Sequence, residues 1–452
     1  MELSEIKQKT LKQIYPTEEF REKLEKTIKE ISYRIKEIIN FEKIPAEILL
    51  VGSTAKDTYL INNMDVDFFL CFPQSFNKEK IAKWAIFIGK KILTNTEESY
   101  AEHPYLRGFF NDFKVEIVPC YKISDISQKL SAVDRTPLHT KYIIDNISEE
   151  QKNEVRLFKQ FLKGIGIYGA EAEIEGFSGY LCELIIIKYG SFEETLKNVS
   201  NWKKGVYISI NDEKHQNFDT PLVFIDPVDK TRNVASALSV DNFNLFMYAC
   251  VSFLKKPDVR FFFPNPIKPW SNDKINQLLN NKSERYIGIR FKKPDIIPEN
   301  LFPQIRKSIK SIVDICERND FKISDSVFHV SDDNVYIILK SDNFLLPKTK
   351  THIGPPSKLK SNVNNFLKKW SNNKKVVKRP YIKGNRYFVE ITRDYLDIKN
   401  FVSNNISNFN FGKHIQPVLK NSFKILENDE LNIEELAIFW TDYFDGKHPW
   451  ER

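Results

Sequence analysis

One segment, residues 48–72, constrains the fold of this chain more than any other: ILLVGSTAKDTYLINNMDVDFFLCF. Its first apolar run, Ile48–Val51, predicts a buried strand, and a Gly52-Ser53 turn ends that run. A second apolar run, Val66–Phe72, predicts another strand. A glycine-serine turn that leaves a strand exposes backbone N–H groups and adds a hydroxyl donor, so the segment predicts a cradle for a phosphate.

Two carboxylates, Asp65 and Asp67, lie at the head of the second strand. Because side chains alternate along a strand, both point to the same side. Carboxylates so close together repel each other unless a cation lies between them, and paired hard oxygen ligands suit Mg²⁺. A phosphate-binding turn followed by such a pair predicts nucleotidyl transfer. The alternative is an edge strand with two solvated aspartates, but the turn and the apolar strand together favour the site.

A third carboxylate, Glu116, lies inside the apolar run 113–121, FKVEIVPCY, which predicts a strand ending at Pro119. An unpaired buried carboxylate is costly, so we expect Glu116 to have a partner, and the metal pair is a candidate. The alternative is an outward-facing glutamate on a half-exposed strand, which would be the better interpretation of Glu116 taken alone.

Helical patterns surround this sheet. Residues 1–43 and 78–93 predict helices, and the apolar spacing of 20–39 predicts that this part packs on the sheet. Further helical patterns cover parts of residues 131–145, 153–165 and 179–189. His139 falls in the first of these later patterns and can equally be a structural histidine. Arg232 and Asn233 are predicted to open a helix, where they either face a base or phosphate or belong to a capping arrangement around Asp229.

The sequence changes character after about residue 255, where several prolines between Pro257 and Pro269 mark a boundary. Beyond it, strand-like runs alternate with Lys- and Asn-rich loops and helices, and His352–Pro356 falls in one predicted loop. Residues 358–379 are strongly basic. This pattern predicts one or two α+β modules with a cationic surface suited to RNA phosphates, although a charge run is more often a solvated face.

Composition sets the outer bounds. The chain has 452 residues, so two to four domains are expected, and its 68 Lys and Arg against 60 Asp and Glu permit a polyanionic partner. Five widely spaced cysteines predict buried free thiols rather than disulfides or a zinc site. No apolar stretch approaches the ~20 residues that cross a bilayer. The charged N-terminus lacks the apolar centre of a signal peptide, so we expect a cytoplasmic protein.

The motifs occur in a fixed order: GSTAKDTYL with MDVDFFLCF, YAEHPY, VEIVPCY, SAVDRTPLHTKY, RLFKQFLKGIGIYGAE, GFSGYLCELIIIKYGSF, IDPVDKTRNVASALS and, near the end, HIGPP and RYFVEI. In this order they resemble the archaeal-type (class I) CCA-adding enzymes, the tRNA nucleotidyltransferases of the polymerase β superfamily. The resemblance implies a multidomain α+β fold. It comprises a nucleotidyltransferase domain with a small mixed sheet over residues 1–135, a helical central domain over 136–256, and an α+β body and tail over 257–452.

The resemblance also implies roles for single residues. Asp65, Asp67 and Glu116 match the three metal-binding carboxylates, so two Mg²⁺ ions are expected, about 3.5–4 Å apart. Arg232 matches the arginine that reads the edge of the incoming base. The positions implied to bind the incoming nucleotide and its triphosphate are Ser53, Lys56, His139, Lys159 and Tyr168.

Three positions depart from the family pattern, which usually has Arg at Lys56, Gly at Asp57 and Asp at Glu116. Lysine keeps the charge of arginine but loses its bidentate fork. Asp57 adds negative charge near a triphosphate unless it points away, and Glu116 lengthens the third ligand by one methylene. These changes bear on rate and metal preference more than on the reaction class.

The implied function is template-independent addition of C, C and A to the 3′ end of tRNA from CTP and ATP. The C-terminal modules would hold the acceptor stem and T arm largely by shape and phosphates, and relatives suggest a homodimer. One alternative is a transferase that forms poly(A) or oligo(A). Another is a catalytically impaired tRNA-binding homologue, motivated by Lys56, Asp57 and Glu116 but disfavoured by the intact pair Asp65 and Asp67.

Overall fold

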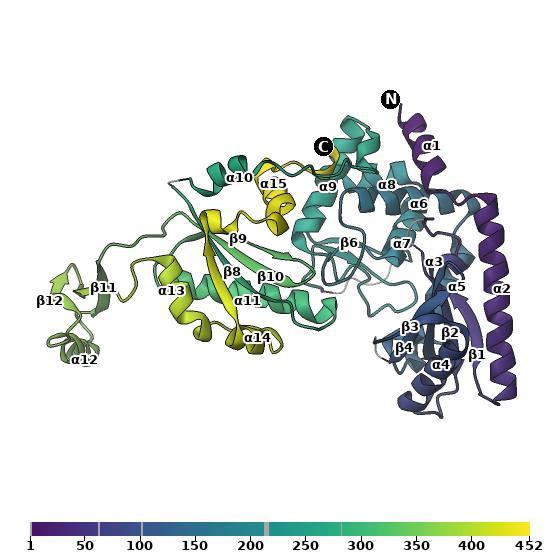
Figure 1. Cartoon of the computed structure of the whole chain (residues 1–452), viewed down its shortest axis with the longest axis horizontal. Coiled ribbons are helices and arrows are strands. Elements are labelled where there is room, and N and C mark those ends of the chain that lie inside the picture. The colour runs from purple at the N-terminus through teal and green to yellow at the C-terminus, as the bar shows by residue number, and fades with distance from the viewer. Residues whose placement is uncertain (1, 62–63, 101–102, 212–216, 282) are drawn as a thin grey trace. The chain divides into compact units, whose positions relative to one another are not determined.

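A computed structural model of the chain describes residues 2–61, 64–100, 103–211, 217–281 and 283–452 (Figure 1). Residues 101 and 102 of the YAEHPY motif lie outside this set. The chain forms two compact units: unit 1 contains Met1–Pro266 and Lys447–Arg452, and unit 2 contains Ile267–Gly446. None of the helices in the described ranges has the length and apolar character required to cross a membrane.

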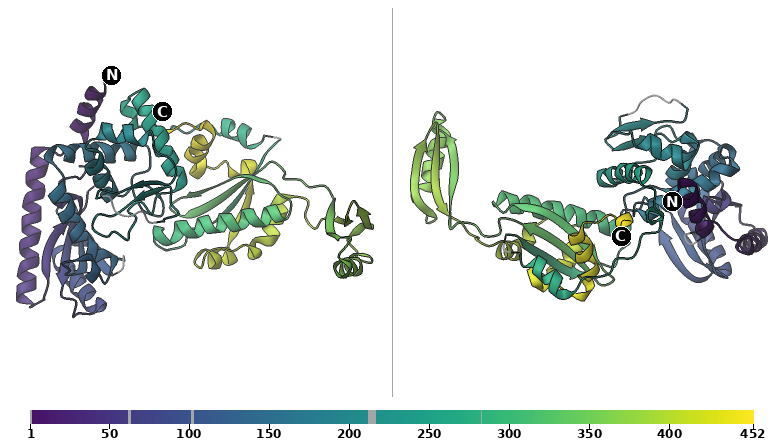
Figure 2. Two further views of the ribbon diagram at one scale, coloured as in Figure 1. Left: turned by 180° about the vertical axis from the view of Figure 1, so that it is seen from behind. Right: turned by 90° about the horizontal axis from the view of Figure 1, so that it is seen from above.

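Unit 1 contains a five-stranded mixed sheet in the order β1-β2-β5-β4-β3. Its strands are β1 (Glu47–Val51), β2 (Val66–Phe72), β3 (Thr94–Tyr100), β4 (Pro104–Phe110) and β5 (Phe113–Tyr121). β2 and β5 are parallel, and the other neighbours are antiparallel. Helices α2 (Glu18–Phe41) and α4 (Lys78–Ile92) cover one face, where they pack on alternate residues of β2 such as Phe68 and Leu70 (Figures 1 and 2). Asp67 therefore faces away from these helices.

Two details of this sheet differ from expectation. The predicted strand at residues 48–51 exists, but it is not buried: β1 is an edge strand, and only Val51 is fully buried. The strand predicted to end at Pro119 continues to Tyr121. Proline is tolerated there because the registered pairs between β5 and β4 stop at Ile117, so Pro119 needs no N–H for that ladder.

The rest of unit 1 is mainly helical. Its helices are α1 (Leu3–Ile14), α5 (Arg135–Asn146), α6 (Glu149–Gly164), α7 (Gly179–Tyr189), α8 (Phe192–Val199) and α9 (Val240–Lys255), with a two-stranded sheet of β6 (Val206–Ile208) and β7 (Leu222–Phe224). These elements share a core rich in phenylalanine. Trp450 of the C-terminal segment joins this core and stacks on Phe261, with ring centroids 4.8 Å apart. Packing is tight at Gly164, where an added Cβ would lie 2.1 Å from the carbonyl oxygen of Phe261.

Unit 2 is built on an antiparallel sheet in the order β14-β8-β10-β9. Its strands are β8 (Arg285–Lys292), β9 (Ile323–Val330), β10 (Asn334–Ser341) and β14 (Phe423–Glu427). The helices α11 (Pro298–Arg318), α13 (Ile398–Asn405) and α14 (Ile415–Asn421) contribute to a core on one face, and α10 (Asn272–Leu279) and α15 (Ala437–Asp445) contribute to a core on the other.

A smaller sheet in unit 2 has the order β11-β13-β12 and packs on helix α12. It consists of β11 (Thr349–Pro356), β12 (Val376–Lys383) and β13 (Arg386–Thr392), with α12 (Lys360–Trp370) between β11 and β12. We call residues 349–392 the three-stranded module. The prediction that His352–Pro356 forms a loop is wrong, because these residues belong to β11, where His352 pairs with Val389.

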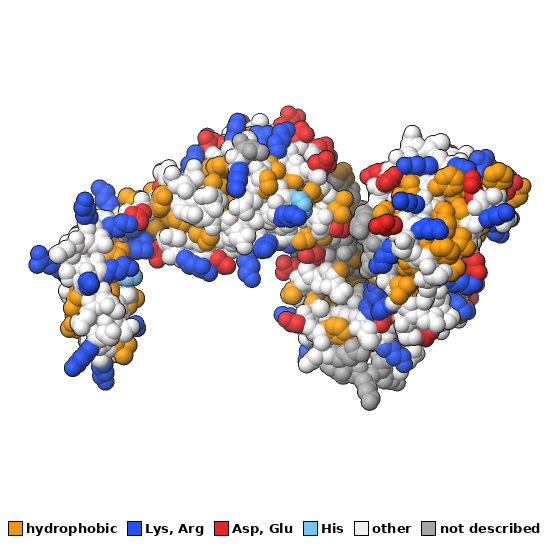
Figure 3. Space-filling model, turned by 90° about the horizontal axis from the view of Figure 1, so that it is seen from below, with side chains coloured by type: hydrophobic (Ala, Val, Ile, Leu, Met, Phe, Trp, Pro, Cys, Tyr) orange, Lys and Arg blue, Asp and Glu red, His pale blue; other side chains and the backbone are white. Residues whose placement is uncertain are grey.

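The three-stranded module carries eleven Lys and Arg residues and a single acidic residue, Glu390. Figure 3 shows blue Lys and Arg side chains spread over this module. The Lys and Arg residues of the predicted cationic surface are therefore concentrated on the three-stranded module of unit 2. All five cysteines are buried and free, which confirms their predicted state.

Candidate active site

The two carboxylates on the strands lie side by side inside the sheet. β2 lies between β1 and β5, and Asp67 is in register with Val51 on one side and with Glu116 on the other. Both acidic side chains project from the face opposite α2 and α4. The alternative of an edge strand with solvated aspartates is wrong for Asp67, because its strand is internal. Asp65 lies immediately before β2 and is 40% exposed.

The turn after β1 is shaped around Asp67. It forms a single helical turn, α3 (Gly52–Ala55), that contains Ser53. Gly52 has a φ of +73°, and an added Cβ would lie 2.1 Å from Oδ2 of Asp67, so only glycine fits there. Thr54 Oγ1 donates to the backbone oxygen of Asp65 at 2.7 Å. The turn predicted to bind phosphate and the two aspartates are therefore parts of one local structure.

The three carboxylates repel one another. Burial, followed by the charges of Glu116 and Asp65, raises the pKa of Asp67 to about 7. Burial also raises the pKa of Glu116, against the opposing effect of Arg107. At neutral pH this arrangement favours an added positive charge, and its oxygen donors are those that a divalent cation prefers. Asp65 and Asp67 thus fit a divalent metal by the chemistry of their donors.

Two basic side chains already contact this group. Lys114 Nζ lies 3.1 Å from Asp65 Oδ1, and Arg107 Nη2 lies 3.3 Å from Glu116 Oε1. Arg107 is directly opposite Glu116 in the β4–β5 pairing. In the described ranges, no three His, Cys, Asp or Glu side chains are arranged so that they could hold a metal ion. Glu116 would have to turn from Arg107 to become a third ligand.

A second cluster lies around Glu183 on α7, which is completely buried. Lys56 Nζ donates to Glu183 Oε2 at 2.5 Å, and Lys159 Nζ on α6 donates to Glu183 Oε1 at 3.0 Å. Thr58 Oγ1 donates to Glu183 Oε1 at 2.6 Å. One carboxylate therefore holds both lysines that were predicted to bind the triphosphate.

The charges in this cluster are mutually stabilised. Burial alone would raise the pKa of Glu183, but Lys159 and Lys56 lower it to about 2. Burial lowers the pKa of Lys159, and the charge of Glu183 opposes that change. Tyr168 lies close by, because an added Cβ at Gly179 would lie 3.2 Å from its hydroxyl and 3.6 Å from Lys159 Nζ. The structure thus brings Lys56, Lys159 and Tyr168 together.

Asp57, one of the three departures, has its charge balanced. Its carboxylate accepts hydrogen bonds from Arg156, which is 1% exposed, and from Arg21 at 3.3 Å. Its φ of +52° is in the left-handed region that favours glycine, which matches the glycine usual in the family. The two arginines neutralise the negative charge at this position.

A third cluster lies around Asp226, which is also completely buried. His139 Nε2 and Asp226 Oδ2 are 2.9 Å apart, and Arg232 Nη1 donates to the same oxygen at 3.0 Å. The hydroxyl of Tyr180 donates to Asp226 Oδ1 at 3.1 Å, and its ring stacks on that of His139 with centroids 4.1 Å apart. Burial alone would raise the pKa of Asp226, but His139 lowers it. His139 and Arg232 are therefore brought together by one carboxylate.

The prediction that Arg232 and Asn233 open a helix is wrong, because α9 begins at Val240. Asn233 has a structural role: its side chain accepts from Phe224 N at 2.9 Å and donates to Leu222 O at 3.0 Å. The alternative of a cap at Asp229 is wrong for the same reason, and the carboxylate of Asp229 instead accepts a hydrogen bond within the turn from Thr231 Oγ1 at 2.7 Å. The structure gives Asn233 and Asp229 local roles and leaves Arg232 beside His139.

Two carboxylates that organise these clusters, Glu183 and Asp226, were not predicted from the sequence. Glu183 had a usable signal, because it is an acid in an otherwise apolar helix, GYLCELIIIKY, and such a group needs a buried partner. The signal at Asp226 was weaker: this acid lies two residues after a short buried strand, β7. Which cations would pair with them depends on contacts between distant segments, and those are absent from the local pattern.

Comparison with known proteins gives three family matches. They are a nucleotidyltransferase domain over residues 10–139, the second domain of tRNA nucleotidyltransferase over residues 153–263, and the C-terminal domain of the CCA-adding enzyme over residues 282–428. Among solved structures, Cid1 poly(U) polymerase with Mg and 3′-dATP aligns with 56% of this chain and 95% of its own, at 12% identity and a TM-score of 0.45.

Full-length relatives are also found. The CCA-adding enzyme of Methanosarcina barkeri is 34% identical over 94% of each chain. That of Methanocaldococcus jannaschii is 35% identical over 92% of this chain and 94% of its own. That of Thermoplasma volcanium is 36% identical over 92% of each. The similarity therefore extends through both units.

Proposed function

The chain belongs to the CCA-adding enzyme family, and on that premise we propose that it adds C, C and A in turn to the 3′ end of tRNA from CTP and ATP. The observation that carries the proposal is the 34% identity to a CCA-adding enzyme over 94% of both chains. The carboxylate pair Asp65 and Asp67, built against the Gly52 turn, supports it as the site of nucleotidyl transfer.

We propose that Asp65 and Asp67 hold two Mg²⁺ ions, with Glu116 as a third carboxylate. The bound metal would supply positive charge that lowers the pKa of the RNA 3′-hydroxyl and offsets the charge of the leaving pyrophosphate. Before a metal binds, Arg107 on the neighbouring strand β4 holds the carboxylate of Glu116 by an ion pair. Lys114 likewise forms an ion pair with the carboxylate of Asp65.

The remaining residues bind and orient the nucleotide. Ser53 and the N–H groups of α3 face the triphosphate in this proposal, together with Lys56 and Tyr168. Lys159 is 1% exposed and held by Glu183, so it acts by fixing Glu183 and hence Lys56 beside the phosphates. His139 and Arg232, oriented by Asp226, present donors to the base edge. A base with the wrong edge would leave these partly buried donors unpaired, which disfavours it.

The domain and assembly proposals follow the family. We propose that residues 1–135 form the catalytic domain, 136–256 a central domain, and 257–452 a body and tail that hold the acceptor stem and T arm. The separate hydrophobic cores of unit 1 support the first division, with the exception that Ile6 of α1 belongs to the core of the central helices. Residues 257–266 and 447–452 belong to unit 1, so the body and tail correspond to unit 2, residues 267–446. We also propose a cytoplasmic homodimer. Light scattering coupled to gel filtration would give the mass in solution, and a single-chain mass would reject the dimer.

The central experiment uses tRNA that lacks its 3′ CCA, Mg²⁺, and labelled nucleotides offered singly and in pairs, with products resolved at single-nucleotide length. We expect growth by two residues with CTP and by three with CTP and ATP. Asp65→Ala should abolish growth, whereas Asp145→Ala, on the exposed surface of α5, should not. Long A tracts would instead indicate a poly(A)-forming enzyme. Binding of tRNA without extension would indicate an impaired homologue.

A further inference from the structure

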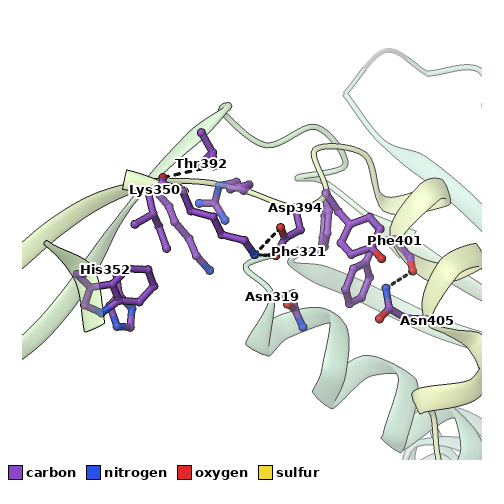
Figure 4. A pocket seen from close by; sticks show the side chains of 13 residues that line it. Asn319, Phe321, Lys350, His352, Thr392, Asp394, Phe401 and Asn405 are labelled. Carbon is purple, nitrogen blue, oxygen red and sulfur yellow. Dashed lines mark hydrogen bonds and ion pairs between the residues drawn. The ribbon is translucent and has the colours of Figure 1, made fainter. Parts of the chain in front are cut away.

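Unit 2 contains a cavity that the active site does not use. It has a volume of about 440 Å³ and lies where the three-stranded module joins the larger sheet (Figure 4). Cavities of roughly 300–1,000 Å³ are the usual size for sites that hold a small molecule or one unit of a polymer. Its walls come from β11, α12 and β13 of the module, from α13, and from the segments that follow α11 and β13.

Flat rings form much of this wall. His352 and Trp370 line the cavity from the module, with ring centroids 5.2 Å apart, and Phe321, Tyr395 and Phe401 line it from the other side. Burial, followed by the charges of two nearby lysines, lowers the pKa of His352, so its imidazole is neutral at pH 7. Neutral aromatic rings are the side chains on which nucleobases stack.

Three cations also line the cavity: Lys350, Lys375 and Arg393. The carboxylate of Asp320 accepts hydrogen bonds from Arg393 and from Lys350 Nζ, the latter at 3.2 Å. The carboxylate of Asp394 accepts a hydrogen bond from Lys375 Nζ at 2.7 Å. Among the described residues, the buried Nε of Arg393 has no hydrogen-bond acceptor. That atom is closed to solvent, so it offers no donor to a ligand in the cavity. Lys375, whose side chain is 47% exposed, is the most accessible of the three cations, and Arg393 is 13% exposed.

We propose that this cavity is a nucleoside phosphate site that holds one unpaired nucleotide of the bound RNA. Its base stacks against His352, and its phosphate contacts Lys375 and Arg393. The surplus of cations on the module favours a polyanion over a neutral ligand. The rings favour an unstacked base over a continuous duplex, whose bases are not accessible. The inference rests on the proposed function, and it specifies how unit 2 would engage the RNA.

The same chemistry can come from a free nucleotide, so the experiment has separate arms. The RNAs are a tRNA lacking CCA, which contains unpaired nucleotides, and a blunt duplex with the sequence of its acceptor stem. The free nucleotides are AMP and CMP. Binding of each is measured by titration over a range of salt concentrations with wild-type protein and with His352→Ala and Lys375→Ala.

Matched controls separate the site from general effects. His329→Ala removes another partly buried histidine of unit 2, and Lys374→Ala removes an exposed lysine beside Lys375; neither lines the cavity. The side chain of Lys375 is 47% exposed, so Lys375→Ala is expected to fold normally, as circular dichroism would verify. It keeps the proposal testable even if His352→Ala perturbs the module.

We expect His352→Ala to weaken tRNA binding about fivefold or more, the effect of losing one base stack, and to leave duplex binding unchanged. Lys375→Ala should reduce the slope of log K against log salt by about 1 for tRNA. If wild-type protein binds AMP or CMP and His352→Ala abolishes that binding, the cavity is a nucleotide site whose occupant can be a free nucleotide. Unchanged tRNA affinity in both variants, or equal losses for tRNA and duplex, would overturn the proposal.

Failure here is distinguishable from failure of the proposed function. If wild-type protein extends tRNA by CCA while the cavity variants bind tRNA normally, the activity stands and the cavity site is rejected. If the cavity variants bind tRNA more weakly than wild-type protein, as expected, but wild-type protein does not extend tRNA, the cavity site stands and the proposed CCA addition is rejected.

Discussion

At the scale of single residues, the charge on Asp67 couples the site to pH. Its pKa is raised to about 7 from an ordinary value of 3.8, so between those values the folded protein binds a proton that the unfolded chain releases. The stabilising effect of this proton is complete below pH 4 and is lost as pH rises through 7. A bound divalent cation would replace it. Protons and metal therefore compete for this carboxylate.

Asp67→Asn should consequently stabilise the metal-free protein at pH 8 and flatten the fall in its stability between pH 5 and 8. The physical reason is that asparagine carries no charge to repel Glu116 and Asp65. Urea unfolding at a series of pH values with a chelator present measures the effect. Asp112→Asn, at a 79% exposed side chain, is the control and should follow the wild-type curve. Identical curves for Asp67→Asn and wild type would contradict the prediction.

Glu183→Gln should destabilise the protein by about 3–5 kcal/mol, because it leaves the ammonium groups of Lys56 and Lys159 buried with no charged partner. The pKa of Glu183 is lowered to about 2 from an ordinary 4.5. Its contribution is therefore present above pH 4.5 and disappears as pH falls towards 2. Chemical denaturation at pH 7 and pH 3 tests both statements.

The control for Glu183 is Glu149→Gln on the exposed surface of α6, where the side chain is 81% exposed and pairs with Lys152. An exposed pair of this kind contributes about 0–1 kcal/mol. If the two substitutions had similar effects on the free energy of unfolding, Glu183 would not be the organising charge of its cluster.

At the scale of elements, the turn between β1 and α3 couples backbone geometry to the carboxylates. Gly52→Ala should weaken binding of Mg²⁺ or Mn²⁺ as well as destabilise the fold, because the new Cβ would collide with Oδ2 of Asp67. The substitution also carries the ordinary cost of a positive φ. Metal titration by calorimetry, beside thermal unfolding, separates the two effects.

Gly205→Ala is the matched control, since Gly205 has a φ of +83° and no atom within 4 Å of an added Cβ. It should lose stability from backbone strain and keep normal metal affinity. Equal metal affinity in the Gly52 and Gly205 variants would show that the close approach to Asp67 is unimportant.

Sequence patterns predicted the type and bounds of individual strands and helices better than they predicted which elements pack beside them. Val66–Phe72 and Gly179–Tyr189 are a strand and a helix over the predicted residues, because apolar runs and caps are local signals. The exposed position of β1, the strand at His352 and the loop at Arg232 depend on neighbours far along the chain. Asp65 and Asp67 stood out because a glycine-serine turn and an apolar strand flank them, and the structure places Glu116 in register with Asp67; their role as metal ligands stays a prediction. The roles of Glu183 and Asp226 could not be predicted, because they depend on which cationic side chains from distant segments face these carboxylates.

At the scale of the whole molecule, the C-terminal segment returns to the unit in which the chain begins. Trp450→Ala should destabilise unit 1 by about 3–5 kcal/mol, because this ring is 5% exposed and stacks on Phe261. Urea unfolding of the full chain would show the loss. Ile438→Ala, at a 54% exposed residue of α15, is the control and should change stability little. A Trp450 variant as stable as wild type would mean that the stack contributes nothing.

The placement of unit 2 between Pro266 and Lys447 has a consequence for the order of synthesis. A ribosome finishes residues 1–266 well before it reaches Trp450, and at about 5–20 residues per second the delay is roughly 10–40 s. During that interval the nascent protein exposes the surface of Phe261 that the last residues cover. Only translation through Trp450 supplies the ring that covers this surface, so chains released early in unit 2 would keep an uncovered aromatic surface, which is the kind of surface that chaperones and proteases bind.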